Sequence, residues 1–318
     1  MKPLALTMGD PAGIGPEITA KAFEELKGEI PFVLLGNAAL IERFGVSVAS
    51  VSSLDEVAGC DRLPVLDVSL PQAVVPGKGD PANAATMITC IERAVSLAQS
   101  GKVSGVVTNP ISKKVLRDGG DFPWPGHTEF LAHLTGAKRP VMMLAGPALR
   151  VVPVTIHIPL ADVPGALDAG LLEETIRITA ADLTARFGIS KPRIAVAGLN
   201  PHAGEGGLMG SEDTQVITPV VQMLAGEGMR ISGPLPADTM FHARARAEYD
   251  VAVCMYHDQA LIPVKTLDFE EGVNVTLGLP IVRTSPDHGT AFDIAGQGIA
   301  DARSLVAAIR LAWDMAAQ

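Results

Sequence analysis

The stretch Leu4-Ala-Leu-Thr-Met-Gly-Asp-Pro-Ala-Gly-Ile-Gly-Pro-Glu17 places a short apolar run before a glycine-rich turn and the start of a helix. Pro16 suits the first turn of a helix, because its fixed φ fits there and its missing N–H is not needed. Such a turn can aim backbone N–H groups at an anion or another ligand. It is neither a Walker A loop nor the G-x-G-x-x-G dinucleotide motif. A ligand-binding turn and a purely structural turn are therefore equally good interpretations of this stretch.

The same alternation of apolar runs and helical periodicity continues along the chain. Apolar residues recur at helical spacing over 84–98, 172–187 and 302–315. We expect strands at residues 4–8, 32–35, 103–108, 141–144, 150–156, 193–197, 251–255 and 273–277. This pattern predicts an α/β fold with largely parallel sheets and helices on both faces. Two Pro/Gly-rich crossings, 121–126 and 280–289, are places where the chain could pass between domains.

Composition excludes several classes of protein. The chain has 318 residues with 47% hydrophobic and 19% charged residues, which is enough for a large packed core or two domains. A formal net charge of −10 argues against a nucleic-acid partner, and an anionic substrate would need local cations. No apolar run approaches the ~20 residues of a membrane span, and no secretion signal is recognisable. The three widely spaced cysteines argue against a disulfide framework, so we expect a cytoplasmic protein.

Three histidines are the best lead to chemistry. His157, His202 and His257 each lie at the end of an apolar run or just past it, in a turn rich in Gly or Pro. Ligands of α/β proteins bind beyond the carboxyl ends of the strands, and imidazole is the commonest metal ligand. Three such ligands would leave a position open for water or substrate, as in catalytic sites. The alternative is three unrelated histidines with local hydrogen bonds. Asp238 and Asp258 could orient the rings or add ligands.

Other candidate residues are each ambiguous when taken alone. His127 precedes a predicted helix and could hold an anion, whereas Thr128 is a good N-cap for that helix. Lys265 lies in an apolar stretch and could act as an acid or base if it is desolvated. Asn274 alternates with valines, so it faces either water or a cleft. Arg283 follows an apolar run and could bind phosphate or carboxylate through two hydrogen bonds.

A second turn-rich loop runs from Asp287 to Gly298. His288 and Asp293 flank a segment of this loop that we expect to enter a short helix. An acidic residue near bound NAD typically accepts hydrogen bonds from the ribose hydroxyls. A glycine-rich connection to a capped helix would explain the same residues without a nucleotide.

Together these motifs resemble those of the 4-hydroxythreonine-4-phosphate dehydrogenase family. They span residues 9–298 in the family's order: Gly-Asp-Pro-Ala-Gly-Ile-Gly-Pro-Glu, Gly-His-Thr-Glu, Leu-Asn-Pro-His-Ala-Gly-Glu-Gly-Gly, Gly-Pro-Leu-Pro-Ala-Asp-Thr, Tyr-His-Asp-Gln, Gly-Val-Asn-Val-Thr-Leu-Gly-Leu-Pro and Arg-Thr-Ser-Pro-Asp-His-Gly-Thr-Ala. The loop after His288 is also similar to the nucleotide loop of isocitrate and isopropylmalate dehydrogenases.

The resemblance implies two α/β domains with the active site in the cleft between them. Residues 1–125 with 286–318 would form the nucleotide side, and 126–285 the metal, substrate and dimerisation domain. A homodimer would share its active sites, with one divalent metal ion (Zn, Co, Mg or Mn) held by ligands from both subunits. The implied metal ligands are His157, His202 and His257. The implied substrate contacts are His127, Thr128, Lys265, Asn274 and Arg283, and those to NAD or NADP are His288, Gly289, Thr290 and Asp293.

The implied reaction is a metal-dependent oxidation of 4-phosphohydroxy-L-threonine with NAD or NADP. The β-keto acid product would decarboxylate to 3-amino-2-oxopropyl phosphate, in pyridoxine 5'-phosphate biosynthesis. Lys265 is the candidate for proton transfer, Asp258 would orient His257 or the metal shell, and Asp293 would favour NAD by repelling a 2′-phosphate. Relatives that oxidise D-threonate or D-erythronate 4-phosphate, or a dihydrodiol, are alternatives with the same chemistry. A phosphate acyltransferase of the same fold and a non-catalytic metal-binding protein are more distant alternatives.

Overall fold

The computed structural model describes residues 1–57 and 59–318, and the chain divides into two compact units. Unit 1 comprises Met1–Pro140 and Leu279–Ala317, and unit 2 comprises Val141–Gly278 with Gln318. These divisions fall at 140/141 and 278/279, whereas the expected domain boundaries were at 125/126 and 285/286. None of the helices in the described residues is long and apolar enough to cross a membrane.

Unit 1 is built on parallel strands in the order β3-β4-β2-β1-β5-β12. Their bounds are β1 Leu4–Thr7, β2 Phe32–Gly36, β3 Val48–Ser50, β4 Leu63–Asp67, β5 Val106–Thr108 and β12 Arg283–Pro286. The strand order changes direction between β1 and β5. Ala5 of β1 lies opposite Val33 of β2 on one side and Val106 of β5 on the other. Such a switch point is where α/β sheets bind ligands beyond their strand ends.

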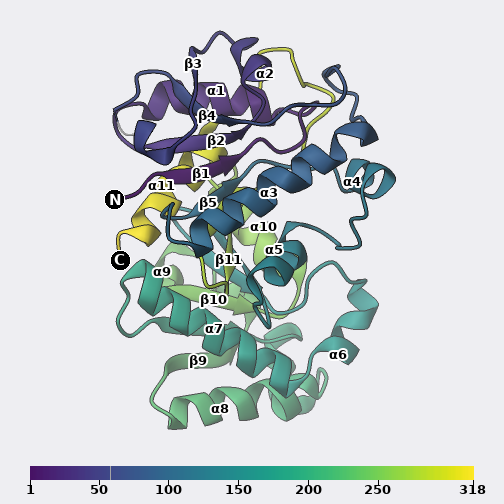
Figure 1. The fold of residues 1–318 in the computed structure, drawn as a ribbon. Coiled ribbons are helices and arrows are strands. Elements are labelled where there is room, and N and C mark those ends of the chain that lie inside the picture. The colour runs from purple at the N-terminus through teal and green to yellow at the C-terminus, as the bar shows by residue number, and fades with distance from the viewer. Residues whose placement is uncertain (58) are drawn as a thin grey trace. The chain divides into compact units, whose positions relative to one another are not determined.

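Helices cover both faces of this sheet (Figure 1). They are α1 Gly15–Leu26, α2 Ala38–Glu42, α3 Ala84–Gln99, α4 Lys113–Gly119, α5 His127–Thr135 and α11 Arg303–Ala316, with short 3-10 turns at Leu54–Glu56 and Pro81–Asn83. Because side chains alternate along a strand, Ala5, Val33 and Val106 share one face and pack against α3. On α3, Met87, Cys90, Ile91, Ala94 and Val95 complete this core at helical spacing.

Unit 2 has strands in the order β11-β6-β7-β10-β8-β9. β6 is antiparallel to β7 and β11, and the pairings from β7 to β9 are parallel. The strands are β6 Val141–Ala145, β7 Arg150–Pro153, β8 Arg193–Ala197, β9 Arg230–Leu235, β10 Val251–Cys254 and β11 Val273–Leu277. The helices are α6 Val163–Ala166, α7 Ala169–Phe187, α8 Thr218–Gly226, α9 Ala243–Arg246 and α10 His257–Leu267. Shorter helical turns are Leu160–Asp162, Pro201–Gly207, Asp213–Ile217 and Ala237–Thr239.

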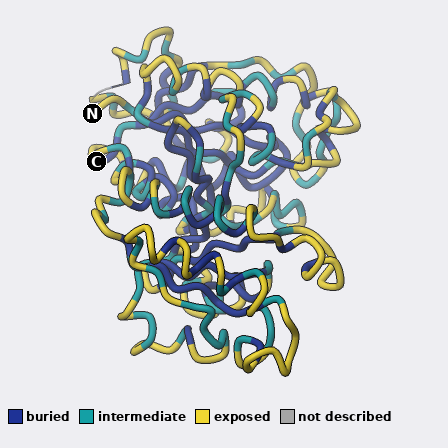
Figure 2. Tube along the Cα trace, turned by 90° about the horizontal axis from the view of Figure 1, so that it is seen from below, coloured by how far each residue is buried: buried dark blue, intermediate teal, exposed yellow. Residues whose placement is uncertain are grey.

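The core of unit 2 explains why α10 lies where it does. Ala260, Leu261 and Val264 of α10 pack on the apolar side chains of β7, β8 and β10. Figure 2 shows such buried segments in dark blue, with exposed connections in yellow around them. Because α10 begins directly after β10, its first turn is held at the carboxyl edge of these strands. The packing of α10 therefore positions His257 at that edge.

The α/β architecture with mostly parallel sheets flanked by helices confirms the predicted fold class. Four strands were not expected: β3, β4, β9 and β12. β12 has the sequence Arg-Thr-Ser-Pro, which has no apolar run, yet it is buried throughout. One of its buried polar groups is satisfied inside the unit, since the Thr284 hydroxyl donates to the carbonyl of Ala308 at 2.8 Å.

Candidate active site

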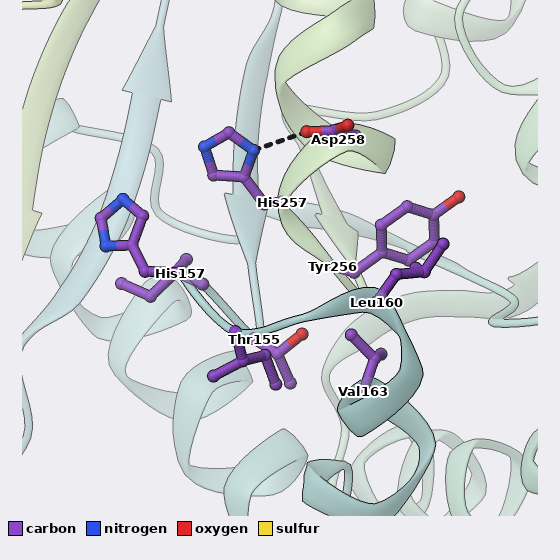
Figure 3. Close-up of a pocket in the computed structure, with 9 residues that line it drawn as sticks. Thr155, His157, Leu160, Val163, Tyr256, His257 and Asp258 are labelled. Carbon is purple, nitrogen blue, oxygen red and sulfur yellow. Dashed lines mark hydrogen bonds and ion pairs between the residues drawn. The ribbon is translucent and has the colours of Figure 1, made fainter.

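His157 and His257 are brought together at the carboxyl edge of unit 2. β7 and β10 are parallel neighbours, with Pro153 opposite Cys254, so both chains leave the sheet on the same side. The centroids of the two imidazole rings are 5.7 Å apart. The rings line a pocket of about 330 Å³ together with Thr155, Ile156, Ile158, Leu160, Val163, Tyr256 and Asp258. Figure 3 shows them side by side, with Asp258 beyond His257.

Asp258 holds the His257 ring. The Nδ1 atom of His257 is 2.7 Å from Oδ1 of Asp258 (dashed in Figure 3). A carboxylate accepting from Nδ1–H fixes the tautomer that leaves Nε2 with a lone pair. Nε2 is therefore the nitrogen that His257 offers to a metal ion or to a substrate proton.

His202 lies in a turn with unusual backbone geometry. His202, Ala203 and Glu205 all have positive φ, at 53°, 52° and 42°. Left-handed backbone costs an L-residue roughly 1–2 kcal/mol, so neighbouring contacts must hold this turn. Asp213 supplies such contacts, because its buried carboxylate accepts from the backbone N–H groups of Leu199 at 2.8 Å and Asn200 at 3.2 Å.

The chemistry of the two imidazoles fits a transition metal, although the described residues do not bring three ligands together. Two imidazoles beside an open pocket, one held by a carboxylate, are ligands that zinc or cobalt accepts. Within residues 1–57 and 59–318, no three His, Cys, Asp or Glu side chains lie close enough together to hold a metal ion. His202 does not line the pocket around the other two histidines. Asp238 is exposed and also lies outside that lining.

Two further residues in unit 2 were candidates for substrate contacts. Lys265 is on α10, and its Nζ lies 5.9 Å from the ring centroid of Phe269. Asn274 is on β11 opposite Leu144 of β6. The Oδ1 atom of Asn274 is buried and has no hydrogen-bond partner in the described part of the chain. A buried acceptor without a partner typically costs about 1–3 kcal/mol, so a donor from a ligand would relieve a real penalty.

Unit 1 carries a cationic group around Arg283, at the start of β12. The guanidinium is 2% exposed, and its Nη2 donates to Oγ1 of Thr108 at 2.6 Å. Burial lowers the pKa of Arg283 to about 10, so it stays charged at neutral pH. Burial also lowers the pKa of His127 well below its usual value, and the charges of Arg283 and Lys113 lower it further. His127 is therefore neutral beside two cations.

His127 and Thr128 begin α5 rather than cap it. The N-cap is Gly126, so the expectation that Thr128 caps this helix is wrong. Gly126 is extended, and the position that a Cβ would take there lies 3.6 Å from Nζ of Lys113. The Nε2 atom of His127 is buried and has no partner among the residues described. The sequence analysis did not identify Lys113. Its position could have indicated it, because it begins α4 just after the turn that follows β5.

The predicted nucleotide loop packs on the glycine-rich turn after β1. The carbonyl of Thr290 accepts from the N–H of Ile14 at 3.0 Å, and a Cβ on Gly13 would lie 2.9 Å from that carbonyl. Glu17 anchors the far end of the loop, because its buried carboxylate accepts from the N–H groups of Gly298 and Ala300 at 3.2 and 2.8 Å. This role of Glu17 was not predicted.

The expected short helix near His288 and Asp293 is absent, because residues 292–296 form turns. Ala291 has a φ of 43°, which a right-handed helix cannot include. His288 Nδ1 lies 3.0 Å from the carbonyl of Gly289, while its Nε2 is buried and unpartnered within the described chain. Asp293 is exposed, with its backbone carbonyl accepting from the side chain of Gln297 at 2.7 Å.

Residues 29–312 match the family model described as "Pyridoxal phosphate biosynthetic protein PdxA". The chain belongs to the PdxA family. It is 55% identical over 321 residues to the 4-hydroxythreonine-4-phosphate dehydrogenase of Paracoccus denitrificans (strain Pd 1222). The match covers 100% of this chain and 98% of that protein. The resemblance found in the motifs is thereby confirmed, and this PdxA-family chain is an oxidoreductase.

Solved structures agree with this assignment. A 4-hydroxythreonine-4-phosphate dehydrogenase from Klebsiella pneumoniae is 40% identical, with a TM-score of 0.91 over 99% of this chain and 100% of that one. A terephthalate 1,2-cis-dihydrodiol dehydrogenase from Burkholderia xenovorans LB400 is 34% identical, with a TM-score of 0.68 over 98% and 97% of the two chains. The PdxA-type fold is therefore shared with an oxidoreductase whose named substrate is different.

The glycine-rich turn of this PdxA-family chain also contains a buried acid, Asp10. Asp10 is only 1% exposed. Its Oδ1 accepts from the N–H of Ala12 at 3.0 Å, and its Oδ2 has no hydrogen-bond partner among the described residues. Burial raises the pKa of this carboxyl. Ionisation of Asp10 therefore favours the unfolded chain. The free energy of unfolding falls as the pH rises from the pKa of Asp10 in the unfolded chain to its higher pKa in the folded protein.

We expect Asp10→Asn to stabilise the protein more at pH 8 than at about pH 3.5, because the amide keeps an acceptor for Ala12 and carries no charge, and the penalty of the carboxylate grows from its unfolded pKa upward. The gain should be about 2–4 °C in melting temperature for each kcal/mol relieved. Melting curves between about pH 3.5 and pH 8, a range that starts near the unfolded pKa, measure it, with the exposed Asp61→Asn as the control. A pH-independent difference would contradict the role of charge burial.

Proposed function

We propose that the chain oxidises 4-phosphohydroxy-L-threonine to 2-amino-3-oxo-4-phosphohydroxybutanoate, with NAD or NADP accepting the hydride and a proton released. This β-keto acid then loses CO₂ to give 3-amino-2-oxopropyl phosphate, in pyridoxine 5'-phosphate biosynthesis. The observation that carries the proposal is the identity of 55% to a protein of that name over essentially the full length of both chains.

The substrate's anionic groups require cations, since the chain has a formal net charge of −10. We assign Arg283 and His127 to the phosphate or carboxylate, with Thr128 beside them on α5. The buried guanidinium and the unpartnered Nε2 of His127 support this assignment. Asn274 is assigned to a hydrogen-bond donor on the substrate, because its buried Oδ1 can only accept.

The proposed ligands of one divalent metal ion are His157, His202 and His257, with both subunits of a homodimer contributing to each site. When bound, zinc, cobalt, magnesium or manganese would supply Lewis acidity toward the substrate alcohol. Asp258 keeps His257 in the tautomer whose Nε2 is a ligand. Lys265 is assigned to accept the hydroxyl proton.

The nicotinamide cofactor is assigned to the loop containing His288, Gly289, Thr290 and Asp293. Two contacts support this: Thr290 packs on the glycine-rich turn, and Glu17 holds the end of the same loop. The exposed carboxylate of Asp293 can accept from ribose hydroxyls and would repel a 2′-phosphate, so NAD is the favoured cofactor.

A second candidate keeps the reaction and changes the substrate. The structural likeness to a dihydrodiol dehydrogenase, at 34% identity, favours including a cis-dihydrodiol, and D-threonate and D-erythronate 4-phosphate are the other candidates. The identity of 55% to a 4-hydroxythreonine-4-phosphate dehydrogenase, against 34% to the dihydrodiol dehydrogenase, favours the phosphorylated substrate. A phosphate acyltransferase would leave the whole-length identity to dehydrogenases unexplained.

Reduction of NAD⁺ or NADP⁺ by the purified protein tests the proposal. We expect 4-phosphohydroxy-L-threonine to be oxidised fastest among the four substrates named, with loss of activity on chelation and recovery when a divalent metal is restored. Each metal should be added back separately. An absence of reduction with every metal present, or faster oxidation of another substrate, would contradict the assigned substrate.

A further inference from the structure

Gln259 connects the turns that carry two of the proposed metal ligands. It lies in the first turn of α10, close after His257, and is 9% exposed. Its Oε1 accepts from the N–H of Met255 at 2.7 Å, and its Nε2 donates to the carbonyl of Gly198 at 2.7 Å. Met255 leads into His257, whereas Gly198 follows β8 and leads into the His202 turn. One buried amide therefore bonds the main chain of both segments.

Contacts on either side extend this connection. The carbonyl of Met255 accepts from the hydroxyl of Thr155 at 2.7 Å, and Thr155 precedes His157 in the chain. Gly198 is packed tightly: a Cβ there would lie 2.7 Å from Cα of Ala203 and 2.7 Å from Oδ1 of Asp213. Displacement of Gly198 would therefore move the His202 turn with it.

The His202 turn needs such anchoring because its backbone is left-handed at successive non-glycine residues. Strained backbone persists only where its surroundings hold it. Metal ligands must also be held within about 0.5 Å of a productive geometry. Asp213 fixes the turn from within, and Gln259 fixes the same turn to the strand that precedes His257.

We propose that Gln259 is a positioning residue, whose side-chain amide fixes the His202 turn relative to His257 and so sets the ligand geometry. This inference rests on the proposed function, in which both histidines bind metal. Glutamine suits the position because it donates and accepts at once, whereas an ionised glutamate can only accept.

Two variants separate the bonds. Gln259→Glu keeps an acceptor for Met255 but places an oxygen against the carbonyl of Gly198, and Gln259→Leu removes both bonds. Gln222→Leu, at an exposed position on α8, is the matched control. Circular dichroism and melting temperature show whether each variant is folded, and Gln259→Glu carries the test if the leucine variant is not.

The direct measurement is amide hydrogen exchange of peptides covering Gly198 to Leu208, with no metal added. We expect about tenfold faster exchange there in both Gln259 variants, because a buried carbonyl loses its donor. Exchange in β6 and β11 of the same unit should match the wild-type chain. The inference would be overturned if the His202 turn exchanged at the wild-type rate in both variants, or if the exchange rate rose evenly over the whole of unit 2.

The second measurement is the affinity for Zn²⁺ or Co²⁺ by equilibrium titration. We expect both Gln259 variants to bind about 10- to 100-fold more weakly than the control, as for other residues that orient metal ligands. Wild-type affinity in both variants would overturn the inference. If the wild-type chain binds no metal, the proposed ligand set fails, while the exchange measurement still decides whether Gln259 anchors the turn.

Discussion

His257→Ala is expected to abolish metal binding and to lower kcat/KM by roughly 10³-fold. The ring is one of the two imidazoles that the structure places 5.7 Å apart, and Asp258 already holds it in the tautomer that a metal needs. Lewis-acid stabilisation is worth several kcal/mol, and about 1.4 kcal/mol corresponds to a factor of ten. The loss should come with an intact fold, because the ring is 39% exposed and contributes little to the core.

Metal content after dialysis and steady-state kinetics measure this effect. His157→Ala and His202→Ala should also lose the metal, and Asp258→Asn should weaken it only about 10- to 100-fold, since Asp258 acts through His257. His133→Ala is the control, because His133 is exposed on α5 and lies outside the pocket around His257. Unchanged metal content in His257→Ala would refute the ligand assignment.

Arg283→Met is expected to lower kcat/KM for the phosphorylated substrate by about 10²-fold. A hydrogen bond to a charged group typically contributes about 1.5–3 kcal/mol, and the guanidinium is only 2% exposed. Because burial lowers its pKa only to about 10, Arg283 stays charged at neutral pH, so its own ionisation should add no pH dependence between 6 and 8. Methionine removes the charge while keeping an unbranched side chain.

Substrate kinetics and cofactor affinity measured together identify the cause. Arg283→Met should change the KM for substrate and leave the affinity for NAD near that of the wild-type chain. The KM of Arg283→Lys should lie between those of the wild-type chain and Arg283→Met, because lysine keeps the charge but lacks the planar arrangement of donors of a guanidinium group. Arg310→Met, which removes an exposed ion pair with Glu29, is the control. A wild-type KM in Arg283→Met would exclude Arg283 from the substrate site.

Local patterns predicted much of the fold correctly. The apolar run before the glycine-rich turn is β1, and Pro16 lies in the first turn of α1, as expected from its fixed φ. The predicted strands at 193–197 and 273–277 match β8 and β11. In each case the signal comes from neighbouring residues, whose alternation or helical spacing reflects which side faces the core.

The failures have tertiary causes. β12 is polar in sequence and becomes a strand because β5 pairs with it and Ala308 accepts the hydroxyl of Thr284. The expected helix after His288 is prevented by the left-handed backbone at Ala291. Lys113, Glu17 and Gln259 were overlooked because their partners are distant in the chain, as in the bond between Gln259 and Gly198.

The amino-acid sequence alone therefore determined the α/β class, the strand–turn–helix start of unit 1 and the residue types available for chemistry. Only the tertiary structure decided that His157 and His257 are neighbours, that His127 is neutral beside Arg283, and that Gln259 joins two turns. The physical reason is that periodicity depends on adjacent residues. Contacts at the strand ends depend instead on strand order, which places β7 beside β10 although α7, β8, α8 and β9 lie between them in the chain.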